Sequence, residues 1–396
     1  MSNNNKTPAI RFKGFTDTWE QRKLGEVADI VGGGTPSTSN DDYWDGDIDW
    51  YAPAEIADQI YVASSERKIT QQGYDNSSAK MLPVGTVLFT SRAGIGKTAI
   101  LRKEGCTNQG FQSIVPHINE LDSYFIFSRS EEMKRYGETV GAGSTFVEVS
   151  GKQMANMELM MPITMEEQVT IGSFFSNLDF LITLHQRKCD KLIQFKAAML
   201  QKMFPQNGAD KPEIRFKGFT DAWEQRELEE VITVGNGMDY KHLSEGDIPV
   251  YGTGGYMLSV DKALSYDKDA IGIGRKGTID KPYVLKAPFW TVDTLFYCIP
   301  KEDYSLDFVY CIFQNVNWKE KDESTGVPSL SKVNINSTDV KVPTLAEQEK
   351  IGAYFAQLDN LITLHQRKCD KYKWKKTLLL ECFRNQQKLK ISLVLD

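Results

Sequence analysis

Two glycine-rich segments carry basic side chains in a pattern that suits binding to an anionic ligand. The first, TSRAGIGKT, contains Arg92 and Lys97 between two strand-like stretches. The second, IGIGRKGT, contains Arg275 and Lys276 between glycines. Glycine lets the backbone approach a ligand closely, and an arginine can donate two hydrogen bonds to guanine O6 and N7. Because this type of loop occurs twice, we expect a ligand-binding role; the alternative is a pair of tight surface turns with incidental charge.

The GIGKT sequence also resembles part of a nucleotide-binding phosphate loop. That motif, G-x-x-x-x-G-K-[ST], requires glycine at position 91, where this chain has Ser91. The lysine of a phosphate loop is followed by a helix, whereas residues 98–101 read as a strand. We therefore expect a basic hairpin loop here and not a nucleotide site.

Further polar side chains in neighbouring loops complete the candidate ligand-binding set. Hydroxyl, amide and ammonium groups of this kind contact phosphates and base edges in protein–DNA complexes. In the first half of the chain the candidates are Thr35, Ser37, Thr90, Ser91, Arg92, Lys97, Gln109, Gln112, Ser144 and Thr145. In the second half they are Lys241, Tyr251, Thr253, Arg275, Lys276, Ser329 and Lys332.

Motifs for catalysis and metal binding are missing from the sequence. It contains no N-P-P-[FY] tetrapeptide of amino-methyltransferases, no phosphate loop, no G-x-S-x-G and no H-E-x-x-H. The acidic run between Asp41 and Asp49 does not have the spacing of a calcium loop, and no histidine pair has metal-ligand spacing. We expect a chain with no catalytic residue, no bound metal and no cofactor of its own.

Composition indicates a folded protein of two or three domains. The chain has 396 residues, of which 41% are hydrophobic and 25% charged, with a net charge of −6. An acidic balance argues against a protein that coats nucleic acid without specificity. The six cysteines form no C-x-x-C motif, and no apolar run is long enough for a membrane span or a signal peptide. We expect a cytoplasmic protein with reduced thiols and no membrane association.

Two internal repeats determine the organisation of the chain. Residues 10–27 and 214–231 differ at only 3 of 18 positions and lie 204 residues apart. Residues 166–192 match 346–372 at an offset of 180, and both copies contain LITLHQRKCDK. The segments between the repeats are unlike. This arrangement suits a duplicated scaffold that contacts two identical partners and carries two inserts for different ligands.

Each copy of the second repeat predicts a long amphipathic helix. Apolar residues recur every three or four positions over about 38 residues, which corresponds to about 57 Å of helix. A helix of this length needs a partner, and we expect the two copies to pack antiparallel with the variable domains at opposite ends. The alternative is a pair of ordinary core helices in separate domains. The residues expected to contact the other helix or a partner protein are Phe174, Leu178, Leu181, His185, Leu192, Leu358, Leu361, His365 and Tyr372.

Positive charge is concentrated in these helical segments. Residues 181–203 carry a net charge of +4 and residues 361–396 a net charge of +6, which leaves about −16 for the rest of the chain. A solvated helix face explains part of this excess, and contact with phosphates or a partner protein explains the remainder.

The expected fold class is α+β, with two mixed α/β target-binding domains separated by two antiparallel, coiled-coil-like helices. The expected divisions are 1–161, 162–205, 206–342 and 343–396. The first and third are the variable domains with their short repeats. The second and fourth are the long helices, and the fourth includes the C-terminal tail.

In combination these segments resemble the specificity subunit of a type I restriction–modification system. The resemblance covers nearly the whole chain and rests on the two IRFKGFTD repeats and on GGGTPSTSNDDYW with GDIDW. It also rests on GDIPVYGTGG with IGRKGT, and on the twice-used LITLHQRKCDK helix. Together these motifs are highly specific, although each glycine-rich piece is weak alone.

The resemblance implies a DNA-reading protein of host defence. In that family, two target-recognition domains each read one half of a split, asymmetric site in double-stranded DNA, and the helices act as a ruler between them. Two modification subunits bind the scaffold and methylate adenine, and restriction subunits join them to cleave unmodified DNA. The specificity subunit itself is not catalytic. S-adenosylmethionine, ATP and Mg²⁺ are expected on the partner subunits.

Two other functions remain open at this point. One is a carbohydrate- or peptide-binding adaptor with two β-rich modules on a helical spacer, which would bind no DNA. The other is a nucleotide-using enzyme that employs GIGKT, for which Lys97 would be essential to ATP binding.

Overall fold

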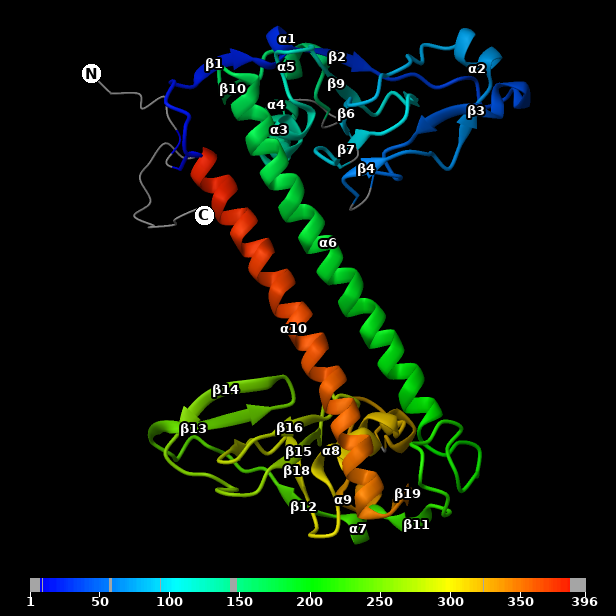
Figure 1. Ribbon diagram of the computed structural model, residues 1–396, viewed down its shortest axis with the longest axis vertical. Coiled ribbons are helices and arrows are strands. Elements are labelled where there is room, and N and C mark those ends of the chain that lie inside the picture. The colour runs from blue at the N-terminus through cyan, green and yellow to red at the C-terminus, as the bar shows by residue number, and fades with distance from the viewer. Residues whose placement is uncertain are drawn as a thin grey trace. The chain divides into compact units, whose positions relative to one another are not determined.

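The computed structural model describes residues 8, 10–56, 59–92, 94–142, 148–322 and 324–384, and it divides into two compact units (Figure 1). The first unit comprises residues 1–184 and 369–396, and the second comprises residues 185–368. Both units contain short strands, short helices and parts of two long helices. The predicted α+β class is confirmed. The unit boundaries fall inside both long helices, whereas the predicted division placed each helix in a segment of its own.

Besides the two-stranded pair of β1 (Glu20–Lys23) and β10 (Glu158–Met161), the first unit contains two sheets built from short strands. One has the strand order β2-β9-β6-β7-β4, with β4 parallel to β7 and the other neighbours antiparallel. The other has the order β5-β3-β8, with β8 parallel to β3. The strand bounds are β2 (Ala28–Gly32), β3 (Trp44–Tyr51), β4 (Tyr61–Val62), β5 (Lys68–Ile69), β6 (Val87–Phe89), β7 (Thr98–Leu101), β8 (Cys106–Thr107) and β9 (Gln112–Pro116). The helices are α1 (Leu24–Val27), η1 (Asp41–Tyr43), α2 (Gln71–Asp75), α3 (Ser123–Ser128), α4 (Ser130–Gly141) and α5 (Gly151–Ala155).

The second unit repeats this plan. Its sheets have the orders β12-β18-β15-β16 and β14-β13-β17, and β17 is parallel to β13. The strand bounds are β12 (Ile232–Asn236), β13 (Glu245–Gly252), β14 (Gly255–Val260), β15 (Ala270–Gly274), β16 (Tyr283–Leu285), β17 (Trp290–Thr291) and β18 (Leu295–Pro300). The helices are α7 (Leu228–Val231), α8 (Leu306–Asn315), η2 (Trp318–Lys321) and α9 (Lys332–Asn336).

Strand register shows that the larger sheet of the first unit and the larger sheet of the second unit are equivalent residue by residue. Ala28 pairs with Pro116 at one end of β2 and β9, and Ile232 pairs with Pro300 at the same end of β12 and β18. The offset of 204 that relates the short repeats therefore continues through the first strand of each sheet. In the part of the chain that the structure describes, β4, η1 and α2 have no counterpart in the second unit, and the short helix η2 follows α8 where α4 follows α3. The two inserts are variants of one β scaffold.

Two long helices, α6 (Met165–Lys202) and α10 (Leu345–Arg384), pair antiparallel within each unit. In the first unit, Lys376 Nζ of α10 donates to Asp179 Oδ1 of α6 at 2.6 Å. In the second unit, Lys196 Nζ of α6 donates to Asp359 Oδ2 of α10 at 2.7 Å. The two ion pairs occupy repeat-equivalent positions. The two predicted helices and their antiparallel pairing are confirmed.

Partly buried ion pairs join the short repeats to the first turns of these helices. Arg11 donates to both carboxylate oxygens of Glu167 at 2.7 and 2.6 Å. Arg215 donates to both oxygens of Glu347 at 2.7 and 2.7 Å. Two parallel hydrogen bonds fix the planes of both groups, so each repeat is held in one orientation on its helix. The strand pairs β1 (Glu20–Lys23) with β10 (Glu158–Met161), and β11 (Glu224–Glu227) with β19 (Asp339–Val342), complete this junction.

The helix residues predicted to form the interface differ in burial. Leu178, His185 and Leu358 are buried. A half-buried group comprises Phe174, Leu181, Leu192, His365 and Tyr372. Leu361 is 44% exposed, although it occupies the same place in the repeat as Leu181. Leu361 therefore lies on a face of α10 that its own unit leaves uncovered, and its contact with a partner stays a prediction.

Candidate nucleic-acid interface

A cavity of about 540 Å³ in the second unit brings together four of the predicted DNA-binding residues. Arg275 and Lys276 follow strand β15, Ser329 precedes α9, and Lys332 is the first residue of α9. These segments are adjacent because Lys276 and Ser329 form an antiparallel bridge. The complete lining is Asn236, Arg275, Lys276, Phe296, Ser329, Leu330, Ser331 and Lys332.

Backbone hydrogen bonds fix the walls of this cavity. Leu330 N donates to Arg275 O at 3.0 Å, and Gly277 N donates to Pro328 O at 2.8 Å. Asp322 Oδ1 accepts from Ser329 N at 2.9 Å. This hydrogen bond and the one from Ser324 N lower the pKa of the Asp322 carboxyl, so the carboxylate holds the loop at neutral pH. The main chain is therefore set before any ligand arrives.

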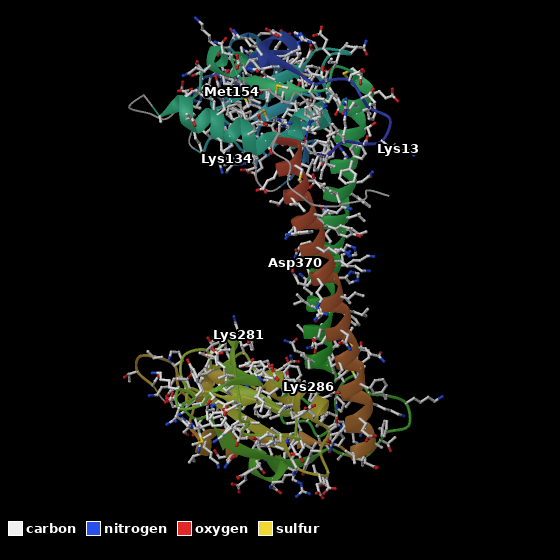
Figure 2. The ribbon with its side chains drawn as sticks, turned by 90° about the vertical axis from the view of Figure 1, so that its left-hand side faces the viewer. Lys13, Lys134, Met154, Lys281, Lys286 and Asp370 are labelled. Carbon is white, nitrogen blue, oxygen red and sulfur yellow. The ribbon has the colours of Figure 1, made fainter. Side chains whose placement is uncertain are left out.

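The cavity presents positive charge to solvent. Arg275, Lys276 and Lys332 are all exposed. The Arg275 guanidinium lies 5.8 Å from the centre of the Phe296 ring, and its Nη1 donates to Asp293 O at 3.5 Å. The same hairpin carries Lys281, whose side chain projects away from the unit (Figure 2). Three cations and two serine hydroxyls around one hollow suit phosphate oxygens and base edges of DNA.

The equivalent place in the first unit has the same frame but different side chains. Arg92 forms an antiparallel bridge with Glu148, as Lys276 does with Ser329. Val149 N donates to Ser91 O at 3.0 Å, which matches the hydrogen bond from Leu330 N to Arg275 O. Strand register makes Gln112 the counterpart of Phe296. Arg92, Glu148 and Gln112 thus stand where the second unit has Lys276, Ser329 and Phe296. Ser91 stands where the second unit has Arg275.

Other predicted residues of the first unit fall into two groups. Thr35 Oγ1 donates to Gln109 Oε1, so these two candidates meet, and Ser37 and Lys97 are exposed. Thr90 and Ser91 are fully buried. They follow strand β6 and face the interior, so their side chains do not present a surface to DNA in this structure. Ser144 and Thr145 lie outside the described residues.

Thr90 instead shapes the basic hairpin. Its Oγ1 donates to Gly94 O at 2.7 Å and accepts from Lys97 N at 2.9 Å. Strands β6 and β7 pair antiparallel on either side of this turn. A strand follows Lys97, as expected for a hairpin and not for a nucleotide-binding loop.

Three predicted residues of the second unit do not line the cavity, and two of them lie in its smaller sheet or in the turn between two of its strands. Tyr251 lies on β13, with its ring centre 6.1 Å from that of Tyr283. Thr253 follows at the turn between β13 and β14, and Lys241 is exposed in the segment after β12. Lys241, Tyr251 and Thr253 therefore stand outside the cavity that contains Arg275.

Sequence reasoning missed Asn236, Phe296 and Ser331 as cavity residues. Asn236 is the counterpart of Gly32 at an offset of 204, and Ser331 caps α9 as Ser150 caps α5. Applying the 204-residue offset beyond the short repeat places Asn236 at the strand end that Gly32 occupies in the first unit. Phe296 had no signal, because its place beside Asn236 depends on strand pairing.

Among the described residues, no three His, Cys, Asp or Glu side chains are grouped closely enough to hold a metal ion. Within the same residues, no helix combines the length and apolar character needed to cross a membrane.

Known proteins resemble this chain in sequence. A family model described as the type I restriction modification DNA specificity domain matches residues 16–194 and again 220–371. The MjaIX specificity subunit of Methanocaldococcus jannaschii is 35% identical over 187 residues, which is 46% of this chain and 43% of that protein. The EcoR124I/EcoR124II specificity subunit of Escherichia coli is 29% identical over 174 residues, or 41% of this chain and 42% of that protein. The matched segments thus span less than half of each of these relatives.

The fold is also known. The crystal structure of a type I restriction–modification S subunit from M. genitalium covers 95% of this chain and 98% of its own, with a TM-score of 0.68 and 15% sequence identity. At this identity the likeness concerns the fold alone. Since the family model matches well over half of the residues, in two copies, this chain belongs to the family of type I restriction–modification DNA specificity domains.

Proposed function

We propose that this chain is the DNA sequence-recognition subunit of a type I restriction–modification complex. Each unit reads one half of a bipartite, asymmetric site in double-stranded DNA. The chain directs adenine methylation by two modification subunits and cleavage of unmodified DNA by restriction subunits. It performs no catalysis itself, so S-adenosylmethionine, ATP and Mg²⁺ act on its partners in the bacterial cytoplasm.

The single observation that carries this proposal is that the two units share the same backbone arrangement around the cavity but place different side chains on it. Arg92 and Lys276 sit at the same bridge, and Gln112 and Phe296 sit at the same place on the neighbouring strand. A protein that binds two copies of one ligand would keep these residues alike. Unlike residues on one frame suit two different base sequences, because base-edge contacts carry specificity.

The long helices offer surfaces for partner proteins. In the first unit they expose Val169, Phe180 and Trp374, and in the second unit Ile193, Phe195, Leu345, Leu361 and Leu364. Phe180 and Trp374 are 64% and 63% exposed, which is costly for large apolar side chains that meet only water. These surfaces support the docking of modification subunits along α6 and α10.

The test is methylation of DNA that has never been modified. The modification subunit is incubated with such genomic DNA, with and without this chain, and methylated adenines are located by sequencing. The proposal predicts methylation at one two-part sequence, and only when the chain is present. Equal methylation without the chain would contradict it.

A further inference from the structure

A buried tryptophan in each unit contacts the loop that follows the first strand of the larger sheet. We infer that this tryptophan positions the loop for reading DNA, and that the two units supply it from opposite members of the same strand pair. The tryptophans are Trp50 on β3 and Trp290 on β17. The role in reading rests on the proposed function, whereas the role in holding the loop does not.

Each tryptophan closes a two-bond clamp on one loop residue. In the first unit, Gly34 N donates to Thr107 O at 2.8 Å, and Gly34 O accepts from Trp50 Nε1 at 2.8 Å. In the second unit, Met238 N donates to Thr291 O at 2.8 Å, and Met238 O accepts from Trp290 Nε1 at 2.9 Å. Gly34 and Met238 are 204 residues apart, so both backbone groups of the same repeat position are held in the same way.

The tryptophan lies on a different member of the equivalent strand pair in each unit. Trp50 lies opposite Cys106 in the parallel pair β3–β8, whereas Val250 lies opposite Trp290 in the pair β13–β17. Each pair therefore contains one large and one small side chain, and all four are buried. The next pair along the strands is Tyr with Thr in both units. Because each pair has a similar total side-chain volume, the same layer of the core is filled whichever strand carries the tryptophan.

The clamp fixes the base of a loop that presents different groups to solvent. The residue before the clamped position is glycine in both units, and a Cβ there would lie 2.0 Å from Asn108 O at Gly33 or 1.9 Å from Val292 O at Gly237. The loop is thus pressed against the adjacent segment as well as held by the indole. Three residues past the clamp come the exposed Ser37 and Lys241.

A tryptophan that only fills the core is the competing explanation. The indole N–H distinguishes the two, because phenylalanine fills most of the same space but cannot donate to the loop carbonyl. Removing that donor leaves the loop carbonyl without its partner, which weakens the loop locally. Trp318 provides a matched control, since its Nε1 donates to Phe313 O at 2.7 Å away from the loop.

The experiment uses the whole chain assembled with its modification subunits and compares Trp50→Phe, Trp290→Phe and Trp318→Phe with the wild type. Hydrogen–deuterium exchange is followed in peptides 35–41 and 239–245. Trp50→Phe is expected to speed exchange in the first peptide about tenfold and to leave the second unchanged. Trp290→Phe is expected to do the reverse, and Trp318→Phe to change neither.

Reading of DNA is measured on the same assemblies by sequencing methylated adenines in unmodified genomic DNA. Trp50→Phe and Trp290→Phe are each expected to relax bases in one half of the site, and not the same half. Unchanged exchange in its own loop would overturn the clamp for either variant. Faster exchange with both halves read as in the wild type would overturn the positioning role alone. If the wild type shows no methylation that depends on this chain, the proposed function fails, while the exchange data still decide the clamp.

A double variant tests the exchange of strands directly. Trp50→Val should lose protection of the first loop, and adding Cys106→Trp should restore it, because that pair reproduces the arrangement of Val250 and Trp290. A folded double variant, with the thermal midpoint of the wild type but an unprotected loop, would show that the two arrangements are not equivalent.

Discussion

Three cations stand around the cavity of the second unit, and their local surroundings assign them different roles. Arg275 stands near an aromatic face and has a planar fork that suits a base edge, whereas Lys332 is a flexible point charge that suits a phosphate. In the first unit, Arg92 is the counterpart of Lys276, so the two units do not present arginine at the same position. On the proposed function, specificity depends on which residue occupies each of these equivalent positions in the two units.

Arg275→Ala is predicted to relax reading at one base position in one half of the target. A bidentate contact contributes about 1–3 kcal/mol of discrimination against the wrong base. The measurement is the rate of methylation of duplexes that differ at single positions. Lys286→Ala is the control, because Lys286 pairs with Asp269 at 2.7 Å and is not part of the cavity lining. Relaxation in both halves would contradict independent reading by the two units.

Lys332→Ala is predicted to behave differently, because a phosphate contact carries no base information. Binding should weaken by a similar factor on every sequence, and the dependence of affinity on salt should become shallower by about one counterion. Titration of the assembled complex with specific and unrelated duplexes at several salt concentrations measures this. A loss confined to one sequence would instead identify Lys332 as a base reader.

The long helices meet through titratable side chains as well as apolar ones. In the second unit, His185 Nδ1 lies 2.8 Å from His365 Nδ1, so one ring must donate to the other while the acceptor stays neutral. Burial is the main cause that lowers the pKa of both imidazoles. Lys188 and Lys368 lower it further, as does the nearby His365 for His185. The helix pair therefore favours neutral histidines.

This arrangement predicts that acid weakens the second unit. A histidine whose folded pKa lies below 6.5 binds fewer protons in the folded chain than in the unfolded chain as the pH falls through that value. The free energy of unfolding should therefore decrease between about pH 7 and about pH 5. Urea unfolding followed across this range measures the slope. The variant His185→Gln/His365→Gln should have a shallower slope, and an equal slope would show that other groups are responsible.

Sequence patterns predict some elements of this fold well and others poorly. The helices α6 and α10 follow from an uninterrupted 3–4 periodicity with proline just upstream, which is a local signal. The cavity depends on the pairing of β12 with β18, whose residues are far apart in the chain, and no local signal predicts that register. Matching the letters VGGG and VGNG even suggests an offset of 203, whereas strand pairing keeps the offset at 204.

At the scale of the whole molecule, charge is distributed unevenly along an acidic chain. The net charge is −6, while the segments 181–203 and 361–396 are basic. A protein of this kind neutralises few phosphates alone, and much of the binding energy of protein–DNA complexes comes from that neutralisation. The proposed complex therefore relies on its modification subunits for part of its contact with the DNA backbone.

The isolated chain is accordingly predicted to bind DNA weakly. Fluorescence anisotropy with a labelled duplex that carries the target should show a much higher Kd for the chain alone than for its complex with modification subunits. The weak binding of the chain alone should also fall steeply as salt is added. Tight binding by the chain alone that does not respond to salt would contradict this prediction.

Two unlike inserts on one duplicated scaffold lead to the central claim, which is that each insert reads its own half of the DNA site. The most direct measurement uses a chain in which residues 28–161 are replaced by a second copy of residues 232–342, assembled with modification subunits. Methylated adenines are then located by sequencing of unmodified genomic DNA. The prediction is a new target that contains the same half-site twice. Retention of the original asymmetric target would contradict the claim that the inserts determine what is read.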